Sequence, residues 1–208
     1  MLIHHVPSII SSLLPQLIWN KDRQERKVYL TFDDGPVPGV TDYVLEMLDK
    51  RKMKATFFMV GDNIRKNPML AKEVLTCGHK VGNHTYHHLN GFQTKEAVYL
   101  QDIEKCQETI GEHLGVFTDL FRPPYGRMTR NQHKKVNSTH QVIMWDVLSG
   151  DFDLNQPAEK CLQKTIKYTK NGSIVVFHDQ VKTKGILKRV LNPYLDFVSD
   201  NGFETGLL

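Results

Sequence analysis

Two adjacent carboxylates, Asp33 and Asp34, follow the apolar run 28–30 and precede Gly35 and Pro36. Neighbouring side chains of a strand point to opposite faces, so the two carboxylates stay close only where the strand ends and the backbone turns. Gly and Pro permit such a turn. The alternative is an ordinary solvated turn, because Asp and Gly are favoured in turns for local reasons. The other motifs decide between the two.

Two imidazoles four residues apart, His84 and His88, have the spacing of metal ligands. Both rings fall on one side if the segment begins a helical turn. Asp34, from another strand end, would then complete a set of two histidines and one carboxylate that leaves positions open for water and substrate. The alternative is a surface cluster of histidines. His79 and His87 are not expected to be ligands, because either fits a satisfied surface or core histidine.

Two further strand ends carry one candidate each. The segment 121–126 is a rigid turn, because its two prolines fix φ, and its Arg122 can hold a carboxylate through paired hydrogen bonds. An ordinary structural ion pair is the alternative for this arginine. His178 follows the apolar run 173–177 and suits a general acid near neutral pH, although a lone histidine at a strand end is often structural.

The chain alternates short apolar runs with amphipathic stretches. After the strand that ends at the carboxylates, the pattern predicts strands at 55–61, 80–85, 119–122, 141–148, 173–177 and 203–207. Helices are predicted at 40–51, 64–76, from an N-cap at Thr94 to about 114, 129–136, 157–168 and 184–200. About seven strands alternating with helices indicate βαβ units, in a closed or nearly closed barrel or an open doubly wound sheet. In either arrangement the polar strand ends share one face.

The bulk properties indicate one α/β domain. A chain of 208 residues is short for two domains, and its 40% hydrophobic and 24% charged residues are ordinary for a soluble protein. The net charge is +4, but Lys and Arg are spread along the chain, so nucleic acid is not expected as a partner. Three cysteines without a CxxC pair indicate neither a disulfide framework nor a thiolate metal site. The oligomeric state stays open.

The N-terminal segment 1–26 is expected to be an arm or short helix packed on a domain that spans 27–208. Its apolar part, 6–19, is too short to cross a membrane, contains two prolines, and is followed rather than preceded by positive charges. A cytoplasmic location without a cleavable signal peptide is therefore expected. Weak association of the arm with a membrane surface is the alternative.

With these residues together, the chain resembles the polysaccharide deacetylases, the NodB-like domains of carbohydrate esterase family 4, from about Lys27 to the C-terminus. The shared motifs occur in the family's order: TFDDG at 31–35, HTYHH at 84–88 for the family's H-S/T-x-x-H, RPPYG at 122–126, and HD at 178–179. The resemblance implies a distorted (β/α)7 barrel. It also implies metal-dependent removal of an N- or O-acetyl group, most often from N-acetylglucosamine units.

The resemblance assigns different roles to the two adjacent carboxylates. It makes Asp34, His84 and His88 the ligands of one divalent ion, with zinc expected and cobalt, nickel or manganese as alternatives. Asp33 would be the catalytic base that takes a proton from water. Arg122 would orient Asp33 and keep it ionised.

Three more roles follow from the family pattern. The backbone N–H of Tyr125 would stabilise the tetrahedral oxyanion. His178 would protonate the leaving amine. An aspartate of the family's fourth motif tunes that histidine, and the matching residue in this chain is Asp151.

The fourth motif departs from the family's usual D-x-x-D-W. Leu148 stands at the first Asp and Phe152 at the Trp, while Val176 stands where Leu is common. Pro123, Phe152 and Val176 are expected to line the substrate pocket. These changes affect the expected substrate more than the chemistry, because a reshaped pocket also suits a lipid-linked sugar or a small N-acyl compound.

Three functions are compatible with these residues. The first is metal-dependent deacetylation of an acetylated amino sugar, in a glycan or in a sugar precursor. The second is hydrolysis of a C–N bond in a non-sugar cyclic amide by the same chemistry. The third is carbohydrate binding without catalysis on the same scaffold. This function predicts that a metal ligand or the base is missing, but the sequence contains both the ligands and the base.

Overall fold

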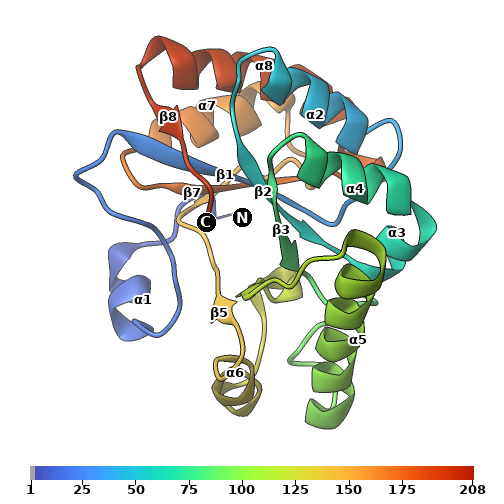
Figure 1. Cartoon of the computed structure of the whole chain (residues 1–208). Coiled ribbons are helices and arrows are strands. Elements are labelled where there is room, and N and C mark those ends of the chain that lie inside the picture. Colours follow the sequence, from blue (N-terminus) through green and yellow to red (C-terminus); the bar gives the residue numbers. More distant parts are fainter. Residues whose placement is uncertain (1–2) are drawn as a thin grey trace.

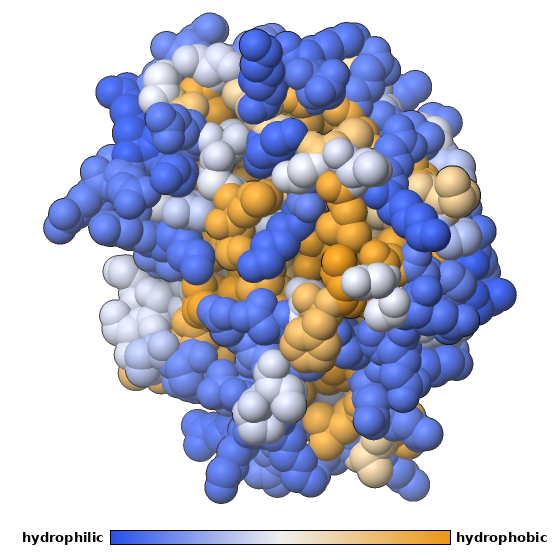
Figure 2. Space-filling view, viewed as in Figure 1, coloured by the Kyte–Doolittle hydropathy of each residue, from blue (hydrophilic) through white to orange (hydrophobic). Residues whose placement is uncertain are grey.

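The computed structural model describes residues 3–208, which form a parallel β-sheet with helices packed on it (Figure 1). In the same view, hydrophilic residues cover most of the surface, and hydrophobic residues are visible between them near the centre (Figure 2). Along the sheet the strands follow the order β5-β4-β3-β2-β1-β7-β6, and the short strand β8 pairs with the start of β1. Every pair in this order is parallel. The sheet forms a half-barrel, because its two end strands, β5 and β6, are not paired with each other. The expected α/β barrel-type fold is confirmed. The strands are β1 (Lys27–Asp33), β2 (Ala55–Met59), β3 (Lys80–Asn83), β4 (Leu120–Phe121), β5 (Gln141–Val142), β6 (Val147–Leu148), β7 (Ile174–His178) and β8 (Glu204–Thr205).

Helices cover the outer face of the sheet in two groups (Figure 1). The first group packs α2, α7 and α8 together, and the second packs α3, α4 and α5. Of the remaining elements, the 3-10 turn η1 and the helix α6 follow β4, and the 3-10 turn η2 follows β7. The helices are α2 (Thr41–Asp49), α3 (Gly61–Lys66), α4 (Pro68–Thr76), α5 (Glu96–Leu114), α6 (Arg130–Val136), α7 (Ala158–Tyr168) and α8 (Lys184–Asp200), and the turns are η1 (Pro124–Gly126) and η2 (Val181–Thr183).

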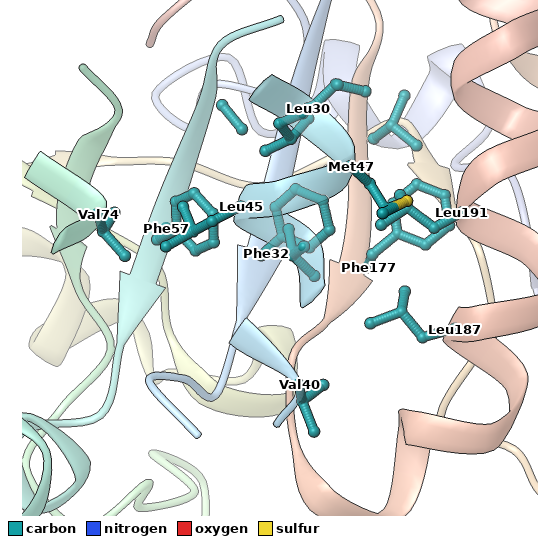
Figure 3. Packing of buried hydrophobic residues seen from close by; sticks show 14 of the residues in the cluster. Leu30, Phe32, Val40, Leu45, Met47, Phe57, Val74, Phe177, Leu187 and Leu191 are labelled. Atoms are coloured by element: carbon teal, nitrogen blue, oxygen red, sulfur yellow. The ribbon is translucent and has the colours of Figure 1, made fainter. Parts of the chain in front are cut away.

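The main hydrophobic core lies between the central strands and the helices α2 and α8 (Figure 3). Phe32 of β1 stacks on Phe57 of β2 and Phe177 of β7, with ring centroids 5.1 and 5.9 Å apart. All three rings are fully buried. Burying one such ring stabilises the fold by about 1.5–3 kcal/mol, so this core fixes the strands whose ends carry the polar residues.

The N-terminal arm lies between the two unpaired ends of the half-barrel. The arm contains the short helix α1 (Ser8–Leu13). His5, before this helix, forms an isolated β-bridge with Val147 of β6, and Ile18, after it, forms one with Ile143, next to β5. The buried ring of Trp19 joins a second hydrophobic cluster. Within residues 3–208, no helix combines the length and apolar character needed to cross a bilayer.

Three predicted elements differ from the structure. The helix predicted at 64–76 is two helices, because Pro68 has no N–H to continue α3 and begins α4 instead. Thr94 is not the N-cap of α5. Its hydroxyl donates to the carbonyl of Asn90, and the N-cap position is occupied by Lys95. The strand predicted at 141–148 is split into β5 and β6, because carbonyls between them accept hydrogen bonds from Arg122.

Candidate active site

A cavity of about 660 Å³ opens at the carboxyl ends of the strands. Nine of the eleven predicted site residues line it. The other two, Arg122 and Asp151, are fully buried directly behind Asp33 and His178. The topology therefore brings together all the residues that the sequence singled out, since parallel strands end on one face.

Asp34, His84 and His88 form a compact group of potential metal ligands. The Asp34 Oδ1 atom lies 2.9 Å from His88 Nε2 and 3.4 Å from His84 Nε2. Ligand atoms bound to one zinc ion at about 2.0–2.2 Å are separated by about 3 to 3.5 Å, so these spacings fit a shared ion. Although Oδ1 is buried, it accepts no hydrogen bond from any residue in 3–208. A cation between these atoms would satisfy that oxygen.

Neighbouring groups orient the three ligand side chains. His84 Nδ1 lies 2.7 Å from the carbonyl oxygen of Arg122, which can only accept, so Nδ1 carries the proton and Nε2 is left free as a ligand. His88 Nδ1 lies 3.2 Å from the hydroxyl of Tyr125. The second oxygen of Asp34 accepts from the Gln180 amide.

The ionisation of Asp34 also suits a metal ligand. Burial acts to raise the pKa of this carboxyl, but the adjacent imidazoles of His84 and His88 outweigh it and hold the pKa well below its ordinary value. The carboxylate is therefore charged at neutral pH, and metal ligands must be deprotonated. Its backbone has φ +82°, a left-handed conformation at the turn that follows β1.

Asp33 faces a different partner. Its Oδ1 atom accepts a hydrogen bond of 2.7 Å from Nη1 of Arg122, whose side chain is completely buried. The guanidinium also donates to the hydroxyl of Thr31 and to the carbonyls of Ile143 and Met144, at 2.7, 3.3 and 2.9 Å. The arginine is thus fixed by four acceptors, and it holds the Asp33 carboxylate in one orientation.

His178 and Asp151 form a second buried pair. His178 Nδ1 lies 2.8 Å from Oδ1 of Asp151, and the His178 backbone N–H donates to the other oxygen, also at 2.8 Å. Ser149 donates to the same carboxylate. Burial acts to lower the pKa of His178, but the charge and hydrogen bond of Asp151 outweigh it and raise the pKa to about 9. The imidazole is therefore protonated at neutral pH and can act as an acid.

A buried carboxyl next to this pair, Asp179, shapes the turn that carries the two carboxylates. It accepts hydrogen bonds from the Gly35 N–H at 3.1 Å and the Thr41 hydroxyl at 2.6 Å. A Cβ atom on Gly35 would lie 2.1 Å from the Asp179 carboxylate, so only glycine fits there. Burial raises the pKa of Asp179 to about 8. The close approach of Asp179, which follows β7, to the turn after β1 therefore requires glycine at position 35.

The predicted pocket residues line the cavity beside the two pairs. The ring of Phe152 meets His178 edge-on, with centroids 5.0 Å apart. Val176 is buried in the middle of β7, and Pro123 begins the turn that carries Tyr125. The Tyr125 backbone has φ +60°, and this conformation presents the residue at the rim, where its side chain is exposed.

The two histidines that were not expected to be ligands lie outside the metal group. His79 Nδ1 accepts from the Ala55 backbone N–H, and burial lowers the pKa of His79 to about 4. His87 Nδ1 lies 2.5 Å from the buried carboxylate of Asp102. Both have structural partners.

Asn63, Trp145 and Gln180 are among the lining residues of the cavity that sequence reasoning missed. Asn63 donates to the Asp34 carbonyl at 2.7 Å, which fixes the backbone of that ligand. Gln180 follows the histidine and aspartate at the end of β7, and Asn63 lies just beyond β2, so a position just past a strand end was a usable signal for both. No comparable signal marked Trp145.

Comparison with known proteins identifies the family. The family model described as polysaccharide deacetylase matches residues 20–142. A peptidoglycan-N-acetylglucosamine deacetylase of Bacillus cereus is 34% identical over 167 residues, which cover 77% of this chain and 76% of the relative. The chain belongs to the polysaccharide deacetylase family.

Two further matches show the range of its relatives. The peptidoglycan-N-acetylglucosamine deacetylase PgdA of Listeria monocytogenes is 35% identical over 164 residues, covering 78% of this chain but only 34% of that longer protein. The crystal structure of the Bc1960 peptidoglycan N-acetylglucosamine deacetylase has a TM-score of 0.90 at 27% identity, with 98% of this chain and 95% of that chain covered.

Similar folds in this family are not all active. A pseudoenzyme of Bacillus anthracis, BA3943, has a TM-score of 0.79 at 25% identity, with 92% of this chain and 66% of that chain covered. Activity therefore depends on the site residues rather than on the fold.

Proposed function

We propose that this protein is a metal-dependent deacetylase that hydrolyses the N-acetyl group of an N-acetylglucosamine-type glycan or sugar precursor. One observation carries the proposal: three ligand atoms of Asp34, His84 and His88 converge beside a separate carboxylate, Asp33, that is held by Arg122. A ligand group and a base placed side by side suit the attack of water on an amide carbonyl. The names of its relatives, which act on peptidoglycan N-acetylglucosamine, point to the same substrate class.

In this mechanism Asp34, His84 and His88 hold the ion. A bound divalent ion would polarise the acetyl carbonyl and acidify water in the site. Asp33 takes the proton from the attacking water, and Arg122 holds that carboxylate in the orientation that faces the water. Zinc fits two imidazoles and one carboxylate, and it remains the expected ion, with cobalt, nickel or manganese as alternatives.

His178, the register partner of Asp33 on the neighbouring strand, supplies the proton for the leaving group. The protonated imidazole of His178 donates to the departing amine, and Asp151 stabilises its positive charge. The backbone N–H of Tyr125 stabilises the oxyanion, a contribution of about 3–4 kcal/mol for a well-placed donor. Pro123, Phe152 and Val176 surround the acetyl group.

Acetate release from chitin oligomers and peptidoglycan fragments by the zinc-loaded protein tests the proposal. We expect release that is lost with a chelator and restored by zinc, and that is lost in Asp33→Asn. Glycan binding with no release at saturating zinc would instead identify a non-catalytic binding protein. Release from cyclic amides but not from sugars would identify the other hydrolase. The cytoplasmic location and the weak membrane association of the arm stay predictions.

A further inference from the structure

The two carboxylate oxygens of Asp34 have different partners. Oδ1 lies 2.9 Å from His88 Nε2 and 3.4 Å from His84 Nε2, and no group in the described part of the chain donates a hydrogen bond to it. Oδ2 accepts a hydrogen bond from the side-chain amide of Gln180. Because an ionised carboxylate only accepts, the amide nitrogen is the group that faces it. Gln180 therefore occupies one oxygen and leaves the other as the free ligand atom.

The main chain of Asp34 is held independently of its side chain. Its N–H donates to the Phe58 carbonyl at 3.2 Å, and its own carbonyl accepts from the Asn63 amide at 2.7 Å. With the backbone fixed, rotation of the side chain is the remaining freedom of the carboxylate. Beside the two imidazoles, the residues in 3–208 offer this carboxylate one hydrogen-bond donor, which is Gln180.

Gln180 is itself held by the turn that follows β7. Its carbonyl accepts from the Thr183 N–H at 3.1 Å and from the Thr183 hydroxyl at 2.9 Å. The same hydroxyl donates to the carbonyl of His178, and the Thr183 side chain is fully buried. These bonds involve the main chain of residue 180, so they do not depend on its side chain. One turn thus carries both His178 and the amide that contacts Asp34.

We propose that Gln180 is a positioning residue of the metal site, which fixes the rotation of the Asp34 carboxylate so that it binds the ion through Oδ1 alone. The inference rests on the proposed metal-dependent function and adds a residue outside the ligand set. A carboxylate that is free to rotate can bind one ion through both oxygens, and the second oxygen then takes a position that water or substrate needs. Hydrogen bonds to metal ligands also strengthen metal binding, because they orient the ligand before the ion arrives.

The zinc affinity of Gln180→Leu tests this role. Leucine has about the volume of glutamine but cannot donate a hydrogen bond. Competition with a chromophoric chelator measures the Kd for zinc without any substrate, and we expect it to rise about 10–100-fold above that of the parent. Gln141→Leu is the matched control, because the Gln141 amide also donates to an aspartate oxygen, Oδ2 of Asp119, at 2.6 Å, and neither residue lines the cavity. Its Kd should equal that of the parent.

Cobalt loading tests whether one oxygen of Asp34 binds the ion. The visible absorption of protein-bound Co²⁺ weakens as the number of its ligands increases. Cobalt-loaded Gln180→Leu should therefore absorb less strongly per ion than the parent, because Oδ2 is then free to bind, whereas Gln141→Leu should absorb as the parent does. An unchanged or lower Kd for zinc in Gln180→Leu would overturn the proposal, and so would an unchanged cobalt spectrum.

Thermal unfolding of the metal-free protein separates positioning from a purely structural role. Metal-free Gln180→Leu should unfold at the temperature of the metal-free parent, because the main-chain bonds of the turn remain. A markedly lower unfolding temperature would contradict the positioning role.

These measurements also separate the inference from the proposed function, because none of them uses a substrate. Zinc binding that weakens in Gln180→Leu would support the inference even in a protein that releases no acetate, and that protein would contradict the proposed function alone. Zinc-dependent acetate release together with an unchanged Kd in Gln180→Leu would contradict the positioning role alone.

Discussion

The buried guanidinium of Arg122 gives the sharpest prediction, for the substitution Arg122→Lys. Lysine keeps the positive charge but has one nitrogen in place of three. At best it can retain the contacts of Nη1 with Asp33 and Thr31, because both accept from that single atom. The bonds from Nε and Nη2 to the carbonyls of Ile143 and Met144 are then lost.

The size of the effect follows from these two carbonyls. Each buried acceptor that loses its donor costs about 1–3 kcal/mol, so the free energy of unfolding should fall by about 2–6 kcal/mol. For a chain of this size, 1 kcal/mol shifts Tm by about 2–4 °C, which predicts a decrease of about 10 °C. Turnover should fall by about a hundredfold, because misplacing a catalytic group by about 1 Å has that effect.

Urea unfolding, thermal unfolding and acetate release measure these effects on the metal-loaded protein. Arg51→Lys is the matched control, because Arg51 is likewise paired with a carboxylate, that of Asp196, to which it makes two hydrogen bonds at the surface. A surface pair of this kind contributes about 0–1 kcal/mol, so this control should unfold nearly as the parent does. If Arg122→Lys changed stability no more than Arg51→Lys and kept its activity, the orienting role of the buried arginine would be refuted.

Two further predictions concern neighbouring groups. Because Asp151 raises the pKa of His178 from 6.5 to about 9, activity should decrease on the alkaline side near pH 9, and Asp151→Asn should move that decrease toward neutral pH in a pH–rate profile. The same pair stabilises the fold fully below about pH 6.5 and progressively less as the pH rises to about 9. The free energy of urea unfolding of Asp151→Asn should therefore lack that pH dependence. A pH–rate profile and a pH dependence of unfolding that both match those of the parent protein would contradict the pairing. Gly35→Ala should destabilise the protein by about 2–4 kcal/mol in urea unfolding, since its Cβ overlaps Asp179. Gly111→Ala, in an open position of α5, should stabilise it by about 0.5–1 kcal/mol, and equal effects of both substitutions would contradict the packing argument.

The positions of the main site residues could be predicted because they depend on topology. Asp34, His84, Arg122 and His178 each lie at or just beyond the end of a strand, and the ends of parallel strands share one face. The alternation of elements therefore brings together residues that are far apart in the chain. The roles of the individual residues came from the resemblance to a family, because strand ends alone do not distinguish a ligand from a base.

The features that were missed depend on contacts between distant segments. The segment 141–148 is divided into β5 and β6 where its backbone makes hydrogen bonds with the guanidinium of Arg122 and the backbone of Ile18. The residue types of 141–148 do not indicate these contacts, because both partners come from distant segments. Likewise, Asn63 enters the site because its amide reaches the Asp34 carbonyl. Local patterns carry no information on such pairings.

The central claim is the division of roles between the adjacent carboxylates, and zinc content tests it most directly. Asp33→Asn and Asp34→Asn are compared by metal analysis after dialysis against zinc, together with acetate release. We predict that Asp33→Asn retains about one ion per chain, as in the parent, and releases no acetate, because a base is lost and the ligands remain. Asp34→Asn should lose most of the ion as well as the activity. Equal loss of zinc in both variants, or full retention in Asp34→Asn, would contradict the account.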